Sequence, residues 1–422
     1  MSGLPDGWEW RTLGDLLVGQ RDRDKLQQGW SPRCHAHPAD HEHWGVLKTT
    51  AAQPGWFDDT QNKQLPDHLE PRPALEVQPG DVLITSAGPR SRCGVPALVR
   101  STRSRLMLSG KFYRFRPTRE IDPAFLESWL LSPTAQHRID AMKTGISESG
   151  LNLTQSRFLS LAVPVPPLDE QHRIVAILED HLAHLDAANS ALSAALVKAA
   201  SLMESTISEM LSTMSSDLVP LGSILAERLV NGKSVPTQDN GFPVLRLTAL
   251  KESTVDLAER KEGAWTAEEA ASFLVREGDI MVARGNGSLN LVARGALVRS
   301  DPDPVAFPDT MIRVRPQSEA MLPSYLIAVW NSRFVRRQVE RVARTTAGIY
   351  KVNQKMLEHI LVPSVPISAQ AVAEKSIAEV GEAQERVVAH VTVVRMKTQA
   401  LRRSLLAAAF RGDLTVDYRE KV

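Results

Sequence analysis

The sequence predicts an α+β protein built from two duplicated domains, each followed by a long helix, with the two helices pairing as a coiled coil. Three observations predict this fold class. Short peptides recur in the same order about 200 residues apart. Turn-and-strand patterns precede helical patterns within each copy. Each copy ends in a sustained seven-residue repeat of apolar positions, and a chain of 422 residues is long for a single domain.

The internal repeat runs through most of the chain. Its matched peptides include Val46-Leu47-Lys48 with Val244-Leu245-Arg246, Gly80-Asp81-Val82 with Gly278-Asp279-Ile280, Leu98-Val99-Arg100 with Leu297-Val298-Arg299, and Phe115-Arg116-Pro117 with Val314-Arg315-Pro316. A single match carries little weight, whereas several in one order indicate a duplication. We therefore expect globular domains at 1–163 and 215–362, a first long helix in 164–214, and a second long helix with a C-terminal tail in 363–422.

The globular copies show the same succession of expected elements. Residues 77–86 and 275–283 each predict a turn followed by a buried strand. Further short strands are expected at 97–100, 112–116, 296–299 and 310–314, and helices at 123–131 and 323–342. Because strands come first and helices later, each copy is expected to be an α+β domain, whose strand order the sequence leaves open.

The long helices each follow a proline-rich start, Pro164 to Gln171 and Pro363 to Gln370. Apolar positions then alternate by four and three residues, which is typical of a coiled-coil seam. The seam is expected at Val175, Leu178, Leu182, Leu185, Asn189, Leu192, Leu196, Ala199, Met203, Thr206 and Met210, and at Ala373, Ile377, Val380, Gln384, Val387, Val391, Val394, Thr398, Leu401, Leu405 and Ala408. Asn189 and Gln384 either fix the register or lie at a wet part of the seam. Gly412 is expected to end the second helix.

Composition favours an ordinary soluble protein with a formal net charge of +1. Its two cysteines, Cys34 and Cys93, fit a reducing compartment and exclude a disulfide framework. The N-terminal segment has no apolar signal-peptide core, and no apolar run approaches the roughly 20 residues that span a bilayer. We therefore expect a cytoplasmic protein.

Local charge is more informative than net charge. Residues 82–119 contain nine basic residues and no acidic one, and residues 333–355 contain seven basic residues and only Glu340 as an acid. Arginine-rich stretches favour a polyanion such as DNA, unless carboxylates from elsewhere in the fold neutralise them. Glycine-bearing polar loops at 86–90, 143–147, 284–288 and 344–348 lie beside these tracts. The candidate DNA-binding residues are Lys48, Ser86, Arg90, Arg92, Arg103, Arg105, Lys111, Lys143, Arg246, Arg284, Asn286, Arg336, Arg337, Arg341, Arg344 and Lys351.

The sequence gives little support for metal binding, catalysis or cofactor binding. Cys34, His35, His37, His41 and His43 are residue types that bind zinc, but their spacing fits no closed site and the second copy has no counterpart. We expect a polar surface insertion there and no metal. The sequence has neither a Gly-x-Gly-x-x-Gly nor a Walker-type loop, no Asn-Pro-Pro-aromatic tetrad, and no cluster of carboxylates with a lysine. We therefore expect no catalytic residues and no cofactor in this chain.

Several stretches of the sequence carry the motifs of one known family. Pro166-Pro167-Leu168-Asp169-Glu170-Gln171 followed by Arg173-Ile174-Val175 is similar to the central conserved region of that family, the specificity subunits of type I restriction–modification systems. Leu405 to Leu414 resembles the end of its distal conserved helix, and Pro5-x-Gly7-Trp8 with Leu13-Gly14 resembles its usual opening. Gly80-Asp81-Val82-Leu83 and Gly278-Asp279-Ile280-Met281 resemble a strand of its target recognition domains. The second helix start, Ile367-Ser368-Ala369-Gln370, departs from the Leu-x-Glu-Gln form.

The resemblance implies a non-catalytic subunit whose two target recognition domains each read half of a bipartite site in double-stranded DNA. It also implies two long helices that pair antiparallel, relate the domains by a pseudo-twofold and dock two methylation subunits. Those partners would bring S-adenosylmethionine and adenine N6 methylation, and two motor–nuclease subunits would add ATP- and Mg-dependent cleavage. Two alternatives remain open: a specificity subunit of a methylation-only system, and a duplicated protein-binding scaffold without DNA readout.

Overall fold

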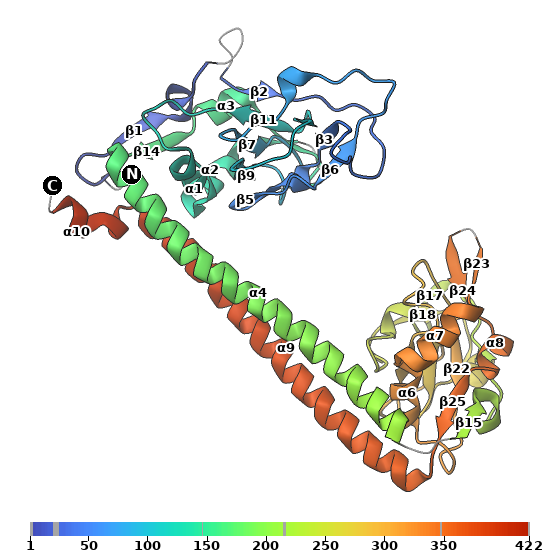
Figure 1. Ribbon diagram of the computed structural model, residues 1–422. Coiled ribbons are helices and arrows are strands. Elements are labelled where there is room, and N and C mark those ends of the chain that lie inside the picture. Colours follow the sequence, from blue (N-terminus) through green and yellow to red (C-terminus); the bar gives the residue numbers. More distant parts are fainter. Residues whose placement is uncertain (1–2, 20–24, 146, 214–216, 347, 421–422) are drawn as a thin grey trace. The chain divides into compact units, whose positions relative to one another are not determined.

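A computed structural model describes residues 3–19, 25–145, 147–213, 217–346 and 348–420 of the chain. The chain divides into two compact units, residues 1–191 with 393–422, and residues 192–392. Each unit contains one globular domain together with about half of each long helix (Figure 1). The globular parts of these units, called domain 1 and domain 2 below, both combine strands with helices, which confirms the predicted α+β class.

Domain 1 is built on an antiparallel sheet of order β2-β11-β7-β9. These strands are β2 (Gln27–Gln28), β11 (Phe112–Phe115), β7 (Val82–Thr85) and β9 (Pro96–Leu98). Helix α1 (Pro123–Leu131) packs beside β9 and is followed by α2 (Pro133–Met142) and α3 (Gln155–Leu159). Four smaller sheets complete this part of the described chain. Two of them are two-stranded and join β1 (Glu9–Thr12) to β14 (Ala162–Val165) and β4 (Ala52–Gln53) to β5 (Trp56–Phe57). The other two are three-stranded, with the orders β10 (Leu106–Met107), β3 (Gly45–Leu47), β6 (Asn62–Gln64) and β12 (Lys143–Thr144), β13 (Leu151–Leu153), β8 (Ala87–Gly88).

Domain 2 repeats this plan with an antiparallel sheet of order β16-β22-β19-β21. Its strands are β16 (Val230–Asn231), β22 (Met311–Val314), β19 (Ile280–Ala283) and β21 (Gly295–Leu297). The helices are α5 (Ala267–Ala270), α6 (Pro323–Asn331), α7 (Arg333–Val342) and α8 (Gln354–Glu358). Smaller sheets join β15 (Asp217–Pro220) to β25 (Leu361–Ser364), β17 (Thr237–Leu245) to β18 (Arg260–Gly263), and β20 (Gly285–Asn286) to β24 (Ile349–Lys351) and β23 (Arg344–Thr346). The duplication seen in the sequence is thus a duplication of topology.

The central strands are buried on both faces. Val82 and Ile84 of β7 join the core that contains α1, while Leu83 between them joins a second core on the opposite face. In domain 2, Ile280 and Met281 of β19 divide between two cores in the same way. A strand with both faces buried is expected to be continuously apolar, which explains why the sequence shows an apolar run here rather than alternation.

A glutamine fixes the start of each long helix to its domain. Helix α4 (Leu168–Thr213) carries Gln171, whose amide donates to Glu120 O at 3.0 Å and Pro166 O at 2.9 Å, while its Oε1 accepts from Asp122 N at 2.9 Å. In helix α9 (Ile367–Ala409), Gln370 makes the same three bonds with Ala320 O, Val365 O and Leu322 N. Both glutamines are fully buried. We call these two sets of three hydrogen bonds the glutamine latches, and they explain why Gln recurs at the same place in both helix starts.

The long helices run antiparallel and side by side within each unit (Figure 1). In the unit that contains domain 1, Asp186 in the first half of α4 pairs with Arg402 near the end of α9. In the other unit, Ile207 and Met210 near the end of α4 share a core with Ala373 near the start of α9. This arrangement confirms the predicted pairing of two helices from one chain.

The seam departs from its predicted positions in the last third of α9. Leu178 is buried, and Leu182, Leu185, Asn189, Leu192, Leu196, Ile377, Val380, Gln384 and Val387 are half-buried. Val391 is buried as well, but Val394 is 39% exposed and Leu401 is 56% exposed. The prediction was wrong at these two positions because it extended the heptad unchanged. An α-helix drifts by about 20° per heptad from a strict seven-residue repeat, and Leu406 and Ala409 here turn into the core of domain 1.

A buried carboxylate in the first turn of α4 ties distant segments together. Glu170 Oε2 accepts from Trp8 Nε1 at 3.0 Å, and its Oε1 accepts from Thr415 Oγ1 at 2.6 Å and from Arg419 Nη1 at 2.7 Å. Arg419 ends α10 (Val416–Arg419). These four residues form the Glu170 clasp, which α9 lacks because Ala369 precedes its latch glutamine.

The turn that leads into the clasp requires glycine. Gly412 has a φ of 81°, and a Cβ at this position would lie 2.5 Å from Pro5 Cγ. Three of the motifs that carry the family resemblance, around residues 5–8, 166–171 and 405–414, therefore meet at one place in the structure.

None of the helices in the described part of the chain is long and apolar enough to cross a membrane.

Candidate nucleic-acid interface

The polar loops singled out in the sequence come together in a small three-stranded sheet in each domain. In domain 1, β13 lies between β8 and β12, so that Ala87 pairs with Asn152 and Thr144 also pairs with Asn152. In domain 2, β24 lies between β20 and β23, and Lys351 pairs with both Gly285 and Arg344. Loops separated by about 60 residues thus form one surface in each copy, which we call the loop sheet.

The cations of the loop sheet in domain 1 are held by carboxylates. Arg90 pairs with Glu148 at 2.6 Å and with Asp140 at 2.7 Å, and Lys143 pairs with Asp140 at 2.9 Å. Hydrogen bonds from Lys143 and Arg90 lower the pKa of Asp140, and Arg90 likewise lowers the pKa of Glu148. Both carboxylates are therefore charged at neutral pH, and the four side chains together carry no net charge.

Three more arginines of the first basic tract also pair with carboxylates outside it. The buried Asp81 accepts from Arg116 Nε at 2.7 Å and lies 3.4 Å from Arg114 Nη1. Arg100 pairs with the buried Glu127 at 3.0 Å. The uninterrupted run of positive charge in residues 82–119 therefore overstates the positive potential of the folded surface.

Three further candidates of domain 1 bind main-chain carbonyl groups. Arg92 donates to the carbonyl oxygens of Thr49 and Ala52, and burial lowers its pKa. Arg103 donates to the carbonyl of Ser104 at 3.1 Å, and Arg105 donates to that of Glu42. These guanidinium groups hold loops in place, which occupies donors that a phosphate would need.

The remaining candidates of domain 1 are Lys48, Ser86 and Lys111. Lys48 is half-buried and precedes a short 3-10 turn, whereas Lys111 is exposed just before β11. Ser86 is buried, and its hydroxyl has no hydrogen-bond partner among the described residues. Its main chain joins the two sheets, because Ser86 N donates to Lys111 O and Ser86 O accepts from Leu153 N.

The candidates of domain 2 fall into two groups. Arg336 donates to Val292 O at 2.6 Å and to Leu289 O at 2.9 Å, and Arg284 donates to Asp309 O at 3.2 Å. Arg246 donates to Arg260 O at 3.3 Å, and Asn286 accepts from Ser288 N at 2.9 Å. The other group has exposed side chains that form no ion pair with any described residue: Arg337, Arg341, Arg344 and Lys351.

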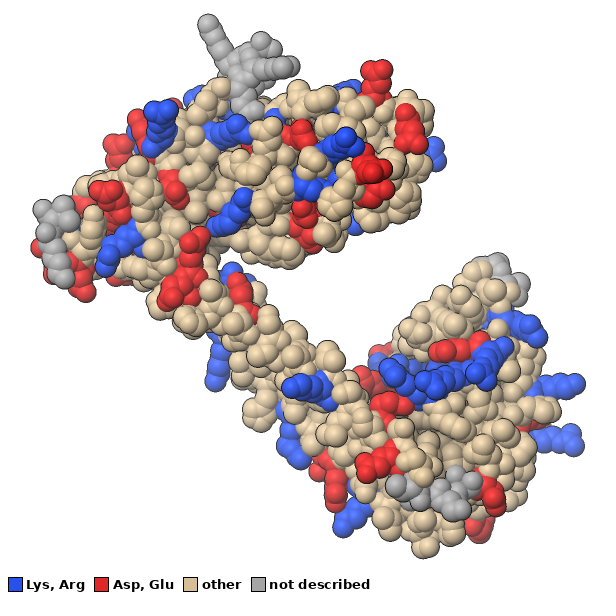
Figure 2. Space-filling view, in the orientation of Figure 1, with Lys and Arg blue, Asp and Glu red and all other residues tan. Residues whose placement is uncertain are grey.

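The two domains therefore differ in surface charge. On the visible face of domain 1, basic and acidic side chains alternate, whereas Lys and Arg gather on domain 2 around α7 (Figure 2). Phosphate binding needs cations that keep donors free, and domain 2 meets this condition better than domain 1.

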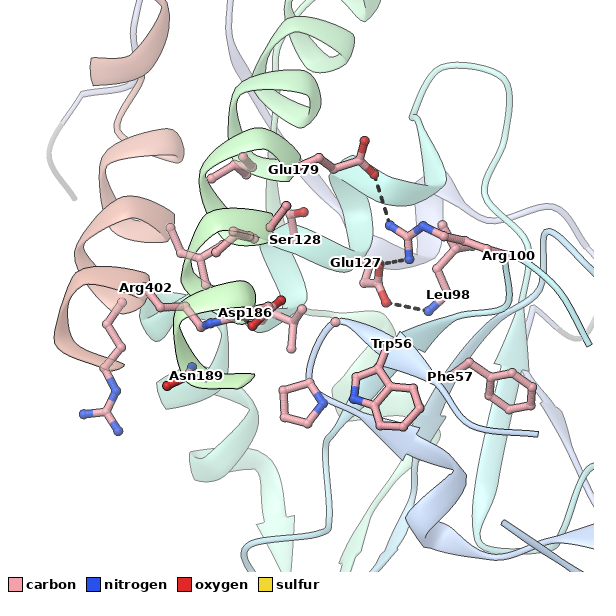
Figure 3. Close-up of a pocket in the computed structure, with 18 of the residues that line it drawn as sticks. Trp56, Phe57, Leu98, Arg100, Glu127, Ser128, Glu179, Asp186, Asn189 and Arg402 are labelled. Atoms are coloured by element: carbon pink, nitrogen blue, oxygen red, sulfur yellow. Dashed lines mark hydrogen bonds and ion pairs between the residues drawn. The ribbon is translucent and has the colours of Figure 1, made fainter. Parts of the chain in front are cut away.

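A groove of about 860 Å³ lies between domain 1 and the long helices, within one unit. Figure 3 shows Arg100 between Glu127 and Glu179, and Asp186 facing Arg402. Burial raises the pKa of Glu127, which also accepts from Leu98 N at 2.6 Å. Trp56 on this wall is 54% exposed. Because the groove's charges largely pair with one another, it offers an apolar and indole surface rather than a polyanion site.

The cysteine and histidine cluster does not gather into a metal site. His35 and His37 stack with ring centroids 5.3 Å apart, His43 bonds Asp40 at 2.7 Å, and Cys34 packs at the edge of a core. Among the described residues, no group of three or more potential ligands could hold a metal ion.

Sequence reasoning missed the carboxylates that neutralise domain 1. Asp140 precedes Lys143 by three residues, a spacing at which side chains on one helix meet, so this pair had a detectable signal. Glu148 and Glu127 lie far in sequence from Arg90 and Arg100, and no local pattern links them.

Comparison with known proteins identifies relatives along the whole chain. Residues 59–196 match the family described as the type I restriction modification DNA specificity domain. The specificity subunit of the type I restriction enzyme EcoEI from Escherichia coli is 37% identical over 194 residues, which are 46% of this chain and 32% of that relative. The chain thus spans about a third of that relative's length. The StySPI specificity subunit from Salmonella potsdam is 24% identical and aligns with 99% of this chain and 91% of its own.

Solved structures share the fold over nearly the full length. A chain from a study of complex assembly and conformational transition in the type I R-M system matches with a TM-score of 0.69 and 19% identity, covering 98% of this chain and all of its own. The HsdS subunit from Thermoanaerobacter tengcongensis matches with a TM-score of 0.50 and 18% identity, covering 97% and 98%. Two domains and two long helices are thus an architecture that these chains have in common.

Proposed function

We propose that this chain is a specificity subunit of a type I restriction–modification system and that it recognises a bipartite sequence in double-stranded DNA, with one half read by each domain. The observation that carries this proposal is the repeated loop sheet. Each domain presents polar loops from three chain segments on one rigid platform, and direct readout of base edges needs side chains fixed in this way.

The chain acts through partners rather than through chemistry of its own. Its family is that of specificity subunits, and the proposed partners are two methylation subunits and two motor–nuclease subunits. These partners would supply adenine N6 methylation with S-adenosylmethionine, and cleavage with ATP and Mg. The role of this chain's own residues is to bind DNA and to position it for those subunits.

The proposal is tested by exchanging residues 1–160 for the same part of another family member and reconstituting the complex with its methylation subunits. Because each domain has its own cores and its own loop sheet, we expect one half of the methylated site to change while the other half stays the same. Sequencing of methylated bases on a random DNA library measures both halves at once.

The matched control exchanges residues 217–362 instead and is expected to change the opposite half-site. If either exchange altered both halves, independent readout would be wrong. If the unmodified complex methylated or bound DNA without any sequence preference, the proposed function itself would be wrong.

A further inference from the structure

Because the two domains are duplicates, their loop sheets can be compared directly. The two loop sheets have the same topology but differ in charge. In domain 1, Arg90 and Lys143 face Asp140 and Glu148, so that two cations meet two anions. In domain 2, Arg344 of β23 lies directly opposite Lys351 of β24. Both side chains are exposed, and neither forms an ion pair with a described residue.

Helix α7 extends this difference. Arg337 and Arg341 are four residues apart, so they neighbour each other on the exposed face of the helix. The corresponding residues of α2 in domain 1 are His137 and Ala141. Arg344 begins β23 two residues after the end of α7, so that the helix leads directly into the loop sheet of domain 2. We call Arg337, Arg341, Arg344 and Lys351 the cationic strip; these residues come from α7, β23 and β24 of domain 2.

The cationic strip is unfavourable for the protein alone. Like charges four residues apart on a helix destabilise it by about 0.2–0.5 kcal/mol, and like charges directly opposite in a sheet are also destabilising. The strip contains one arrangement of each kind, and no described carboxylate, the exposed Glu340 of α7 included, forms an ion pair with any of its four cations. A bound polyanion would relieve both repulsions, whereas the neutral loop sheet of domain 1 gains nothing comparable.

We propose that the cationic strip binds backbone phosphates of duplex DNA without reading bases, and that it supplies most of the salt-dependent DNA affinity of the chain. The inference rests on the proposed function and adds a division of labour to it. Besides reading its own half-site, domain 2 holds DNA electrostatically at any sequence, while the neutral loop sheet of domain 1 contributes mainly through the fit of its half-site.

The test measures how DNA affinity depends on salt in the chain assembled with its methylation subunits, using a duplex oligonucleotide that contains the methylated site. Each phosphate contact adds about 0.9 to the slope of log Kobs against log salt. The variants Arg337→Gln/Arg341→Gln and Arg344→Gln/Lys351→Gln are each expected to reduce the magnitude of that slope by about 2. The preference for the correct site over a scrambled duplex should be unchanged in both.

Three control variants separate the alternatives. Arg337→Lys/Arg341→Lys keeps the charge and should keep the slope. Arg90→Gln/Glu148→Gln removes an ion pair of domain 1 without changing net charge and should leave the slope as it was. Lys198→Gln/Lys375→Gln removes two exposed charges from the long helices and should also leave it unchanged. Thermal unfolding of every variant verifies folding, and the exposed Gln variants should unfold no earlier than the wild type.

The proposal is overturned if the strip variants keep the wild-type slope, or if the domain 1 variant lowers the slope as much as they do. It is also overturned if the strip variants lose their methylation subunits instead, because the strip would then be a protein contact. If the DNA affinity of the wild-type complex fell steeply with salt but showed no sequence preference, the proposed function would be wrong and this inference would still hold.

Discussion

Asp81 and Asp279 occupy the same place in the two domains and explain the recurring Gly-Asp pair. Each carboxylate is fully buried and follows a glycine of positive φ, Gly80 at 88° and Gly278 at 86°. Asp279 accepts from Arg315 Nε at 2.6 Å and Nη2 at 2.8 Å, and from Arg276 N at 2.8 Å. The pair thus makes a turn and anchors the strand that follows it. Its recurrence in both copies reflects folding rather than DNA contact.

Replacing Asp279 with Asn is therefore expected to destabilise domain 2 by about 3 kcal/mol, because it leaves the Arg315 guanidinium beside a neutral group at the edge of the core. Urea unfolding followed by circular dichroism measures the change. Asp303→Asn is the matched control, since Asp303 is exposed and lies in the same domain. Equal stability of the two variants would show that the buried pair contributes nothing.

At the scale of elements, the glutamine latches decide how each long helix leaves its domain. Gln171 and Gln370 each make two donated bonds and one accepted bond, all with main-chain groups. One donated and one accepted bond lie just before α1 or α6, and the other donated bond goes to the carbonyl just before the long helix itself. A helix held by one rotating bond could swing about its first turn, whereas three bonds to fixed carbonyl and amide groups restrict its direction.

Gln171→Glu tests this role with little change in shape. A carboxylate still accepts from Asp122 N but cannot donate to Glu120 O and Pro166 O, so two carbonyl groups, of which that of Pro166 is buried, lose this partner. We expect a loss of about 2–4 kcal/mol and faster amide hydrogen exchange in residues 168–175. Gln370→Glu should do the same in residues 367–374. A variant with wild-type exchange rates would show that the latch is dispensable.

The long helices and the central strands could be predicted from the sequence because their signals are periodic or continuous. The heptad located α4 and α9, and the apolar runs located β7 and β19. The loop sheets could not be predicted, since strands of two or three residues such as β8 and β12 have no period of their own. The candidate cations were recognised in the sequence as Lys and Arg residues of basic tracts. Arg92 and Arg336 nevertheless bind carbonyl groups, a role that only the fold determines.

On the scale of the whole molecule, the chain consists of two units with separate cores, and each should respond to damage on its own. Trp330 of α6 is 2% exposed and donates to Ala293 O at 2.8 Å. Trp330→Ala is expected to cost about 3–5 kcal/mol in domain 2 through the cavity that it leaves. Hydrogen exchange should accelerate in residues 280–314 and stay unchanged in residues 82–115. Equal acceleration in both stretches would contradict two separate units, and Trp129→Ala supplies the reciprocal control in domain 1.

The Glu170 clasp has a consequence for synthesis of the chain. Trp8 and Thr415 meet on one carboxylate although Thr415 follows Glu170 by 245 positions. During translation a domain ordinarily folds soon after its own residues emerge, in N-to-C order. Two of the donors to the buried carboxylate of Glu170, Thr415 and Arg419, are synthesised only after all of domain 2. Domain 1 therefore starts to fold first and completes its folding last. If translation stops before residue 415, the released chain lacks the donors that the first domain needs to complete its fold.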